Sequence, residues 1–150
     1  MLKQKLQGEL RQSMLARDAL KTSVLRMVLS SVNYYEIQKG GAGYEATDED
    51  VLSVIQKEAK QRRDSIEEFK KANRPELVEK ETKELEMLQV YLPQQMGEEE
   101  IKKLVIGVIK ETNAKGMQDI GKVMGTLMPK VKGKADGGLV SKIVKESLSS

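Results

Sequence analysis

The sequence predicts an all-α protein in two parts: an N-terminal four-helix bundle over residues 1–93 and a small three-helix domain over residues 97–150. Three observations support this prediction. Apolar residues recur at spacings of three and four along nearly the whole 150-residue chain. No run alternates apolar and polar residues in the way that a half-buried strand does. The breaks between apolar stripes coincide with glycine or proline.

Two apolar stripes at the N-terminus predict a helical hairpin. The first stripe runs over residues 2–14, and the second runs over residues 20–35 and stops at the glycines of KGGAG, residues 39–43. The members of the first stripe are Leu2, Leu6, Leu10 and Met14.

Capping signals predict the third and fourth helices. Thr47, followed three residues later by Asp50, resembles a capping box, and the helix that it begins continues to about Asn73. Asn73 is then a candidate N-cap of the fourth helix. Pro75 suits the first turn of that helix, and Glu76 is placed to complete a second box.

The segment KEAKQRRDSIEEFKK, residues 57–71, contains two adjacent basic residues, Arg62 and Arg63. Acidic and basic residues lie four positions apart in it, as Glu58 and Arg62 do. Because such pairs meet on a helix surface, the pattern favours a solvated, ion-paired face over an RNA-binding basic helix.

The second part begins after Pro93, at a boundary placed in residues 93–97. Apolar stripes over residues 101–108, 117–128 and 140–148 predict its three helices.

Composition excludes much catalytic chemistry. The chain has no cysteine and no histidine, so it has no thiol nucleophile, no thiolate or imidazole metal ligand and no histidine base. The acids of residues 47–96 lack the spacing of a calcium loop. We therefore expect no catalytic residue, no metal site and no cofactor. The longest apolar runs are far shorter than a membrane helix, and the N-terminus lacks a signal-peptide stretch. A cytoplasmic protein with no membrane partner is expected.

Positive charge is concentrated near the C-terminus. The formal net charge is +3, and residues 97–150 hold all of the excess, with ten lysines against seven acids. In MPKVKGKADGG, residues 128–138, Pro129 is expected to end the sixth helix, so that the lysines lie in the connection. Asp136 is the candidate N-cap of the seventh helix.

Composition leaves two interpretations of this segment open. In one, mobile lysines and a helix N-terminus bind phosphates; in the other, the segment is a solvated connection. The candidate nucleic-acid-binding residues are Lys122, Lys130, Lys132, Gly133, Lys134 and Lys142. Gly121 and Gly125 form a GxxxG spacing in the sixth helix, which favours close packing of another helix over close approach of a phosphate backbone.

Two stretches carry a family resemblance. AKQRRDSIEEFKKANRPELVEKETKELEMLQVYLPQQM and DIGKVMGTLMPKVKGKADGGLVSKIVKESL together resemble the YqeY-like proteins over essentially the whole chain. The second stretch also resembles the C-terminal tail of GatB, a subunit of the tRNA-dependent amidotransferase. The positions that match the tail pattern are Gly121, Met124, Lys130, Gly133, Lys134, Ala135 and Asp136. Gly137 stands where that pattern commonly has proline.

The resemblance implies an all-helical, non-catalytic tRNA-binding or accessory module related to tRNA-dependent amidation. Its expected partners are tRNA and a protein of tRNA metabolism or translation, and the oligomeric state is not predicted. The alternative is a protein-interaction adaptor that binds no RNA. Carbon–nitrogen ligase activity with glutamine as amido donor, as the amidotransferase itself would suggest, is less favoured, because the nucleophiles and bases most used for acyl transfer are absent.

Overall fold

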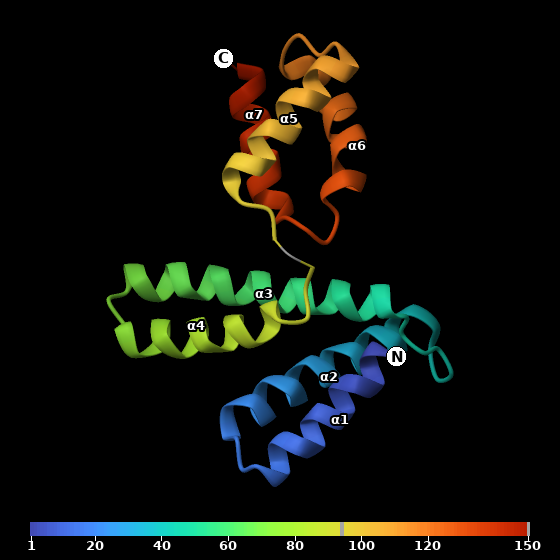
Figure 1. Ribbon diagram of the computed structural model, residues 1–150, viewed down its shortest axis with the longest axis vertical. Helices are drawn as coiled ribbons and strands as arrows, with labels where there is room; N and C mark the ends of the chain where they lie inside the picture. The colour runs from blue at the N-terminus through green and yellow to red at the C-terminus, as the bar shows by residue number, and fades with distance from the viewer. Residues whose placement is uncertain (94, 150) are drawn as a thin grey trace. The chain divides into compact units, whose positions relative to one another are not determined.

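The computed structural model describes residues 1–93 and 95–149 and confirms the all-α prediction (Figure 1). These residues form seven α-helices and one short 3-10 helix and contain no strand. The chain divides into two compact units, Met1–Leu92 (unit 1) and Pro93–Ser150 (unit 2). No helix in the described part of the chain combines the length and apolarity needed to cross a membrane.

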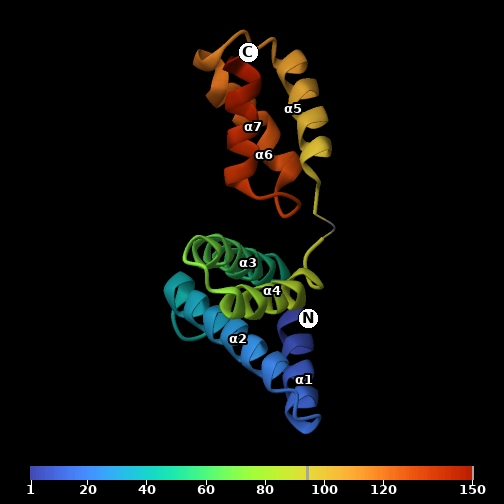
Figure 2. The same cartoon turned by 90° about the vertical axis from the view of Figure 1, so that its left-hand side faces the viewer.

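Unit 1 is built from two helical hairpins that pack on one another (Figures 1 and 2). Buried side chains from all four helices, including Leu6, Val28, Ile55 and Leu88, meet in one core. The helices are α1 (Leu2–Leu15), α2 (Ala19–Gly40), α3 (Asp48–Lys71) and α4 (Pro75–Gln89).

The ends of α3 and α4 confirm one predicted cap and correct another. Thr47 and Asp50 form the reciprocal capping box that begins α3. Asn73 is not the N-cap of α4; it has φ +56° and ends α3, while Arg74 precedes α4 without a side-chain cap. Asparagine tolerates this left-handed conformation, which lets the Arg74 amide donate to the Phe69 carbonyl at 2.9 Å. Glu76, expected to complete a capping box, pairs with Arg74 instead, at 2.7 Å.

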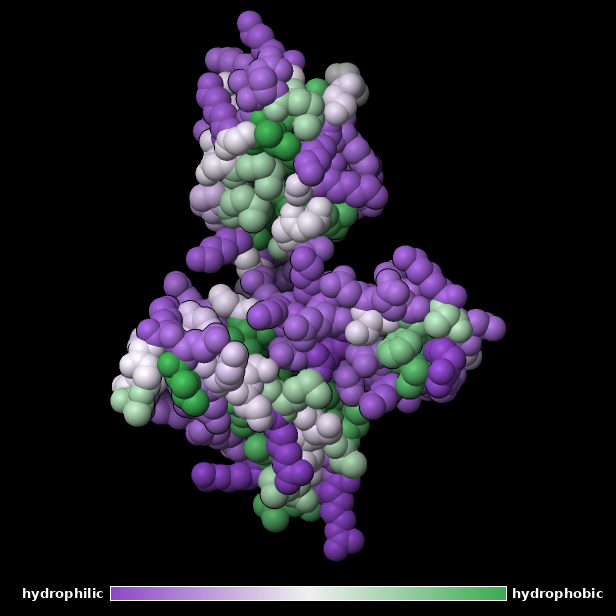
Figure 3. Space-filling model, turned by 180° about the vertical axis from the view of Figure 1, so that it is seen from behind, coloured by the Kyte–Doolittle hydropathy of each residue, from purple (hydrophilic) through white to green (hydrophobic). Residues whose placement is uncertain are grey.

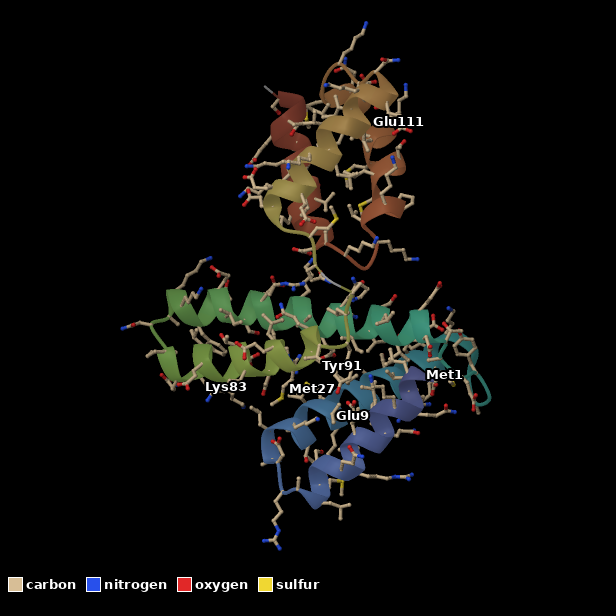
Figure 4. The ribbon with its side chains drawn as sticks, in the orientation of Figure 1. Met1, Glu9, Met27, Lys83, Tyr91 and Glu111 are labelled. Atoms are coloured by element: carbon tan, nitrogen blue, oxygen red, sulfur yellow. The ribbon has the colours of Figure 1, made fainter. Side chains whose placement is uncertain are left out.

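Arg62 overturns the prediction of a solvated face on α3. It is only 5% exposed and lies between two carboxylates that are also buried, Glu58 and Glu84. Its Nη1 donates to Glu58 Oε2 at 2.7 Å, and its Nε lies 3.5 Å from Glu84 Oε2. The guanidinium also donates to the sulfur of Met27, which is labelled on α2 in Figure 4. Burial arises because α4 covers this side of α3, a contact that helical spacing within α3 does not reveal.

Unit 2 consists of three helices around an aliphatic core (Figures 1 and 2). Its buried residues include Ile101, Val105, Leu127, Val140 and Ile143. The four tyrosines and the single phenylalanine of the chain all lie in unit 1, so no ring contributes to this core. The elements are α5 (Glu98–Thr112), a 3-10 turn (Met117–Asp119), α6 (Ile120–Val131) and α7 (Gly137–Ser149).

Candidate nucleic-acid interface

The turn between α6 and α7 carries the centre of the predicted site. Lys132, Gly133 and Lys134 occupy it, and the amides of Lys134 and Ala135 both donate to the Val131 carbonyl, at 2.9 and 3.1 Å. Gly133 has φ +80°, a conformation that glycine adopts without strain and that a lysine in the same place would resist. The turn therefore has a defined backbone that presents lysine side chains.

Residues 95–96 lie along this turn and hold its outer carbonyl groups. The Met96 amide donates to the Lys134 carbonyl at 2.7 Å, and Gln95 Nε2 donates to the Gly133 carbonyl at 3.1 Å. These bonds satisfy two backbone acceptors that would otherwise face water or a ligand. What the turn offers to a ligand is consequently its cationic side chains.

A shallow groove of about 430 Å³ lies beside the turn. Lys130 and Lys134 both line it, and Glu100 lies among the same lining residues. The full lining consists of Pro93, Gln95, Met96, Glu100, Leu104, Lys130 and Lys134. The groove therefore combines two ammonium groups with an apolar floor and one carboxylate.

Lys130 lies in α6 and not in the connection, contrary to the prediction. Pro129 is inside the helix, which continues to Val131. A proline lacks only its own amide hydrogen and clashes with the carbonyl four residues earlier, here that of Gly125, so near a helix end it costs one bond. As a result Lys130 belongs to helix α6, and its Nζ pairs with Glu111 Oε2 of α5 at 3.1 Å. Glu111 is labelled in Figure 4.

The six predicted binding residues are brought together only in part. Lys130 and Lys134 share the groove, and Lys132 and Gly133 share the turn. Lys122 lies eight residues before Lys130 on α6, about 12 Å along the axis at 1.5 Å per residue. Lys142 lies on α7. Neither Lys122 nor Lys142 lines the groove.

Most of these lysines have no anionic partner in the molecule. Lys122, Lys132, Lys134 and Lys142 are exposed and form no ion pair within the part of the chain that the structure describes. Only Lys130 is paired, and its side chain is still 44% exposed.

The glycine pair of α6 does not support helix packing. A Cβ atom placed on Gly121 or Gly125 would meet nothing within 4 Å, and both residues are exposed. The packing interpretation is therefore wrong within this chain. The two glycines leave one face of α6 without side chains and exposed to solvent.

Sequence reasoning missed Gln95, Met96 and Glu111. They lie 38, 38 and 19 residues from their partners in the site. No local pattern connects residues so far apart, and the polar character of Gln95 and Glu111 is typical of any surface.

Asp136 caps α7 as predicted. Its Oδ1 accepts from the Gly138 amide at 3.3 Å, and its carbonyl accepts from the Val140 amide at 3.0 Å. The single acid in this lysine-rich segment is thus occupied by the helix end.

Replacing Asp136 with alanine is expected to lower the free energy of unfolding of unit 2 by about 1 kcal/mol, because the cap acceptor is lost. Urea unfolding followed by circular dichroism measures the change. Asp136→Asn is the matched control, since it also removes the charge but keeps an acceptor. Equal destabilisation by both substitutions would show that charge, and not capping, is what matters.

The groove and turn offer electrostatic binding and little else. Their ionisable groups are lysines and the carboxylate of Glu100; the lysines can hold an anion by charge-assisted hydrogen bonds, whereas Glu100 would repel it. In the described residues, no three acidic, histidine or cysteine side chains converge as metal ligands would.

The fold and this site together define an all-helical protein of two units whose C-terminal unit presents a lysine-rich turn. A family model described as "Yqey-like protein" matches residues 3–148. The chain therefore belongs to the YqeY-like family.

Curated relatives carry one recurring name. "Altered inheritance of mitochondria protein 41, mitochondrial" of Pyrenophora tritici-repentis is 43% identical over 103 residues, which cover 67% of this chain and 56% of that protein. Its namesake in Lachancea thermotolerans is 40% identical over 90 residues, 59% of this chain and 46% of that protein. The protein of the same name in Saccharomyces cerevisiae (strain YJM789) is 30% identical over 128 residues, which cover 81% of this chain and 68% of that protein. The chain spans about half the length of the first two.

These names correct the expectation of a cytoplasmic protein, which is wrong because the relatives are named as mitochondrial. The expectation rested on the lack of an apolar signal-peptide stretch. That criterion does not recognise mitochondrial targeting segments, which are amphipathic and rich in arginine and serine.

Proposed function

We propose that this protein is a non-catalytic, RNA-binding accessory module and that tRNA is the ligand of its lysine-rich turn. One observation carries the proposal: four of the five lysines predicted as binding residues are exposed and form no ion pair among the described residues. The only acid of residues 121–145, Asp136, caps a helix. The four lysines are Lys122, Lys132, Lys134 and Lys142. The resemblance of the same stretch to the tail of GatB supports tRNA as the ligand.

Binding of this kind depends on phosphates and not on bases. Lysine is a flexible point charge that gives affinity without much discrimination among sequences. Unit 2 also lacks aromatic side chains on which bases could stack. The open face left by Gly121 and Gly125 would let a sugar–phosphate backbone approach α6 closely beside Lys122.

An accessory role agrees with the chemistry of the site. Acyl or amide transfer needs a nucleophile with an activating base, whereas the groove contributes two lysines, which suit anion binding, and one carboxylate. Glutamine-dependent carbon–nitrogen ligation would thus fall to a partner enzyme of tRNA metabolism, with this protein holding the RNA.

The triple variant Lys130→Gln, Lys132→Gln, Lys134→Gln tests the proposal. It is expected to bind all tRNAs more weakly, and its slope of log affinity against log salt should be smaller by about two to three units, because each phosphate contact contributes about 0.9. Titration of purified protein with several tRNAs at a series of salt concentrations, followed by fluorescence anisotropy, measures both quantities.

The control variant replaces Lys70, Lys71 and Lys83 by glutamine. It loses the same three charges from side chains that are 60%, 75% and 56% exposed in unit 1. The control should retain the parental slope. If the turn variant kept both the affinity and the slope of the parent, the proposal would be wrong.

A second candidate function, a protein-interaction adaptor without RNA binding, is favoured by one feature of unit 1. A groove of about 400 Å³ between α2 and α3 exposes Met27 and Tyr34, which are 42% and 62% exposed. Methionine and tyrosine are common at protein-binding surfaces. This candidate predicts no tRNA binding and no salt dependence in the experiment above.

A further inference from the structure

The end of the α1–α2 hairpin exposes apolar side chains on a rigid turn. Leu15 is 86% exposed, and Met14, the last member of the predicted apolar stripe of residues 2–14, is 49% exposed. The turn is not loose: the Asp18 amide donates to the Ser13 carbonyl at 2.9 Å, and the Ser13 hydroxyl bonds to that of Thr22 at 2.9 Å. The two apolar side chains are therefore held outward by an ordered backbone.

Arginines surround these apolar side chains. Arg11 lies one helical turn before Leu15, Arg17 is in the turn itself, and both are exposed. Arg26 of α2 reaches back, with its Nη2 3.9 Å from the sulfur of Met14. We call Met14, Leu15, Arg11, Arg17 and Arg26 the hairpin tip. In Figure 3 the tip is at the bottom, where apolar surface is flanked by long hydrophilic side chains.

The tip has almost no compensating negative charge. Residues 11–26 contain four basic residues, which are the three arginines and Lys21. Their single acidic residue is Asp18. Asp18 is already used as the N-cap of α2, because its Oδ1 accepts from the Lys21 amide at 3.1 Å. None of the three arginines forms an ion pair within the residues that the structure describes.

We propose that the hairpin tip docks on the surface of an anionic phospholipid bilayer. Met14 and Leu15 insert among the lipid headgroups, and the three arginines bind lipid phosphates. Exposed apolar side chains among unpaired cations are complementary to this surface, where apolar burial and attraction to anionic lipids add together.

A protein partner fits the tip less well. Stable protein interfaces bury about 800 Å² on each side, and one leucine and one methionine on a convex turn supply only a small part of that area. A bilayer needs no matching concave surface, since lipids rearrange around an inserted side chain.

Docking of this kind departs from the expectation of no membrane partner. That expectation rested on the lack of an apolar segment long enough to span a bilayer. Peripheral binding does not need one, because the chain stays at the interface.

Flotation with lipid vesicles tests the proposal on the full chain. The protein should float with vesicles of equimolar phosphatidylcholine and phosphatidylglycerol at low salt, and much less with pure phosphatidylcholine. Leu15→Asp should weaken binding by more than about tenfold, because an inserted apolar group becomes a carboxylate. The variant Arg11→Gln, Arg17→Gln, Arg26→Gln should weaken it by about 100-fold, at roughly fivefold for each arginine.

Matched controls separate the tip from general surface effects. Ile37→Asp makes the same change at a 66% exposed residue of α2, about 27 Å along the helix from its start. The variant of Lys70, Lys71 and Lys83 removes three positive charges elsewhere. Both should bind within about twofold of the parent, because neither alters the tip.

Failure to float with anionic vesicles at low salt would overturn the proposal. Vesicle binding by Leu15→Asp equal to that of the parent would also overturn it, because it would show adsorption by charge alone. So would the finding that the tip holds two copies of the chain together, with a dimer that Leu15→Asp abolishes and no binding to vesicles. The result is independent of the proposed RNA binding: the glutamine variant of the turn lysines should still float, and Leu15→Asp should still bind tRNA.

Discussion

Replacement of Arg62 by methionine is expected to lower the free energy of unfolding of unit 1 by about 3–5 kcal/mol. The substitution fills similar volume but leaves Glu58 and Glu84 buried, at 7% and 5% exposure, without the cation between them. Uncompensated buried carboxylates are costly because water no longer solvates them and no opposite charge replaces it. Urea unfolding followed by circular dichroism measures the loss.

Two comparisons show whether the charge triad causes this effect. Arg74→Met removes an arginine with an equally short ion pair, but one whose partners are 58% and 59% exposed; it should change the free energy of unfolding by less than about 0.5 kcal/mol. The variant Glu58→Gln, Arg62→Met, Glu84→Gln removes every charge of the triad and should recover most of the stability. If Arg62→Met were no more destabilising than Arg74→Met, the buried triad would not be a structural element.

Replacement of Leu127 by alanine is expected to unfold unit 2 at room temperature. Leu127 is fully buried in the aliphatic core, and such truncations cost about 2–5 kcal/mol. Unit 2 spans 58 residues, from 93 to 150, and a core of that size supplies only about 3–5 kcal/mol of net stability. The expected loss of stability is therefore as large as the whole free energy of unfolding of unit 2.

Hydrogen exchange measures this outcome unit by unit. Amides of α5, α6 and α7 should lose protection in Leu127→Ala, while those of α1–α4, which share a separate core, should keep it. Met128→Ala is the control at the neighbouring position, because Met128 is 37% exposed. Protection of unit 2 in Leu127→Ala equal to that of the control would contradict the expectation.

Helix ends were predictable where a few neighbouring residues contain the whole signal. The Thr47–Asp50 box and the Asp136 cap each need only three or four consecutive residues, and both are present as predicted. Asn73 failed the same reasoning because its side chain suits two roles. A polar residue that can begin one helix can also end another in the left-handed conformation.

The surroundings of Arg62 and the glycine pair were not predictable from spacing. Residues four positions apart meet on a helix whether that face is solvated or covered, and only the α3–α4 contact decides the matter for Glu58 and Arg62. In the same way, the spacing of Gly121 and Gly125 permits a close neighbour without providing one.

The candidate site was predictable in its charges and not in its shape. The cluster of lysines lies in one short segment, so the sequence alone reveals it. The groove depends on Met96 and Gln95 crossing to the Gly133–Lys134 turn, and on Lys130 standing on a helix beside Glu111. These are contacts between segments, which apolar periodicity does not encode.

The absence of rings from the core of unit 2 has an optical consequence. Because every tyrosine and the phenylalanine are in unit 1 and the chain has no tryptophan, the near-ultraviolet absorption and intrinsic emission of the protein arise from unit 1 alone. Unit 2 is dark at these wavelengths. A single tryptophan at Ile106, a 51% exposed position of α5, would then emit against a background from the other unit only, and excitation at the red edge would isolate it. Unfolding of each unit can thus be followed separately in the same intact chain, unit 1 by tyrosine emission and unit 2 by tryptophan emission.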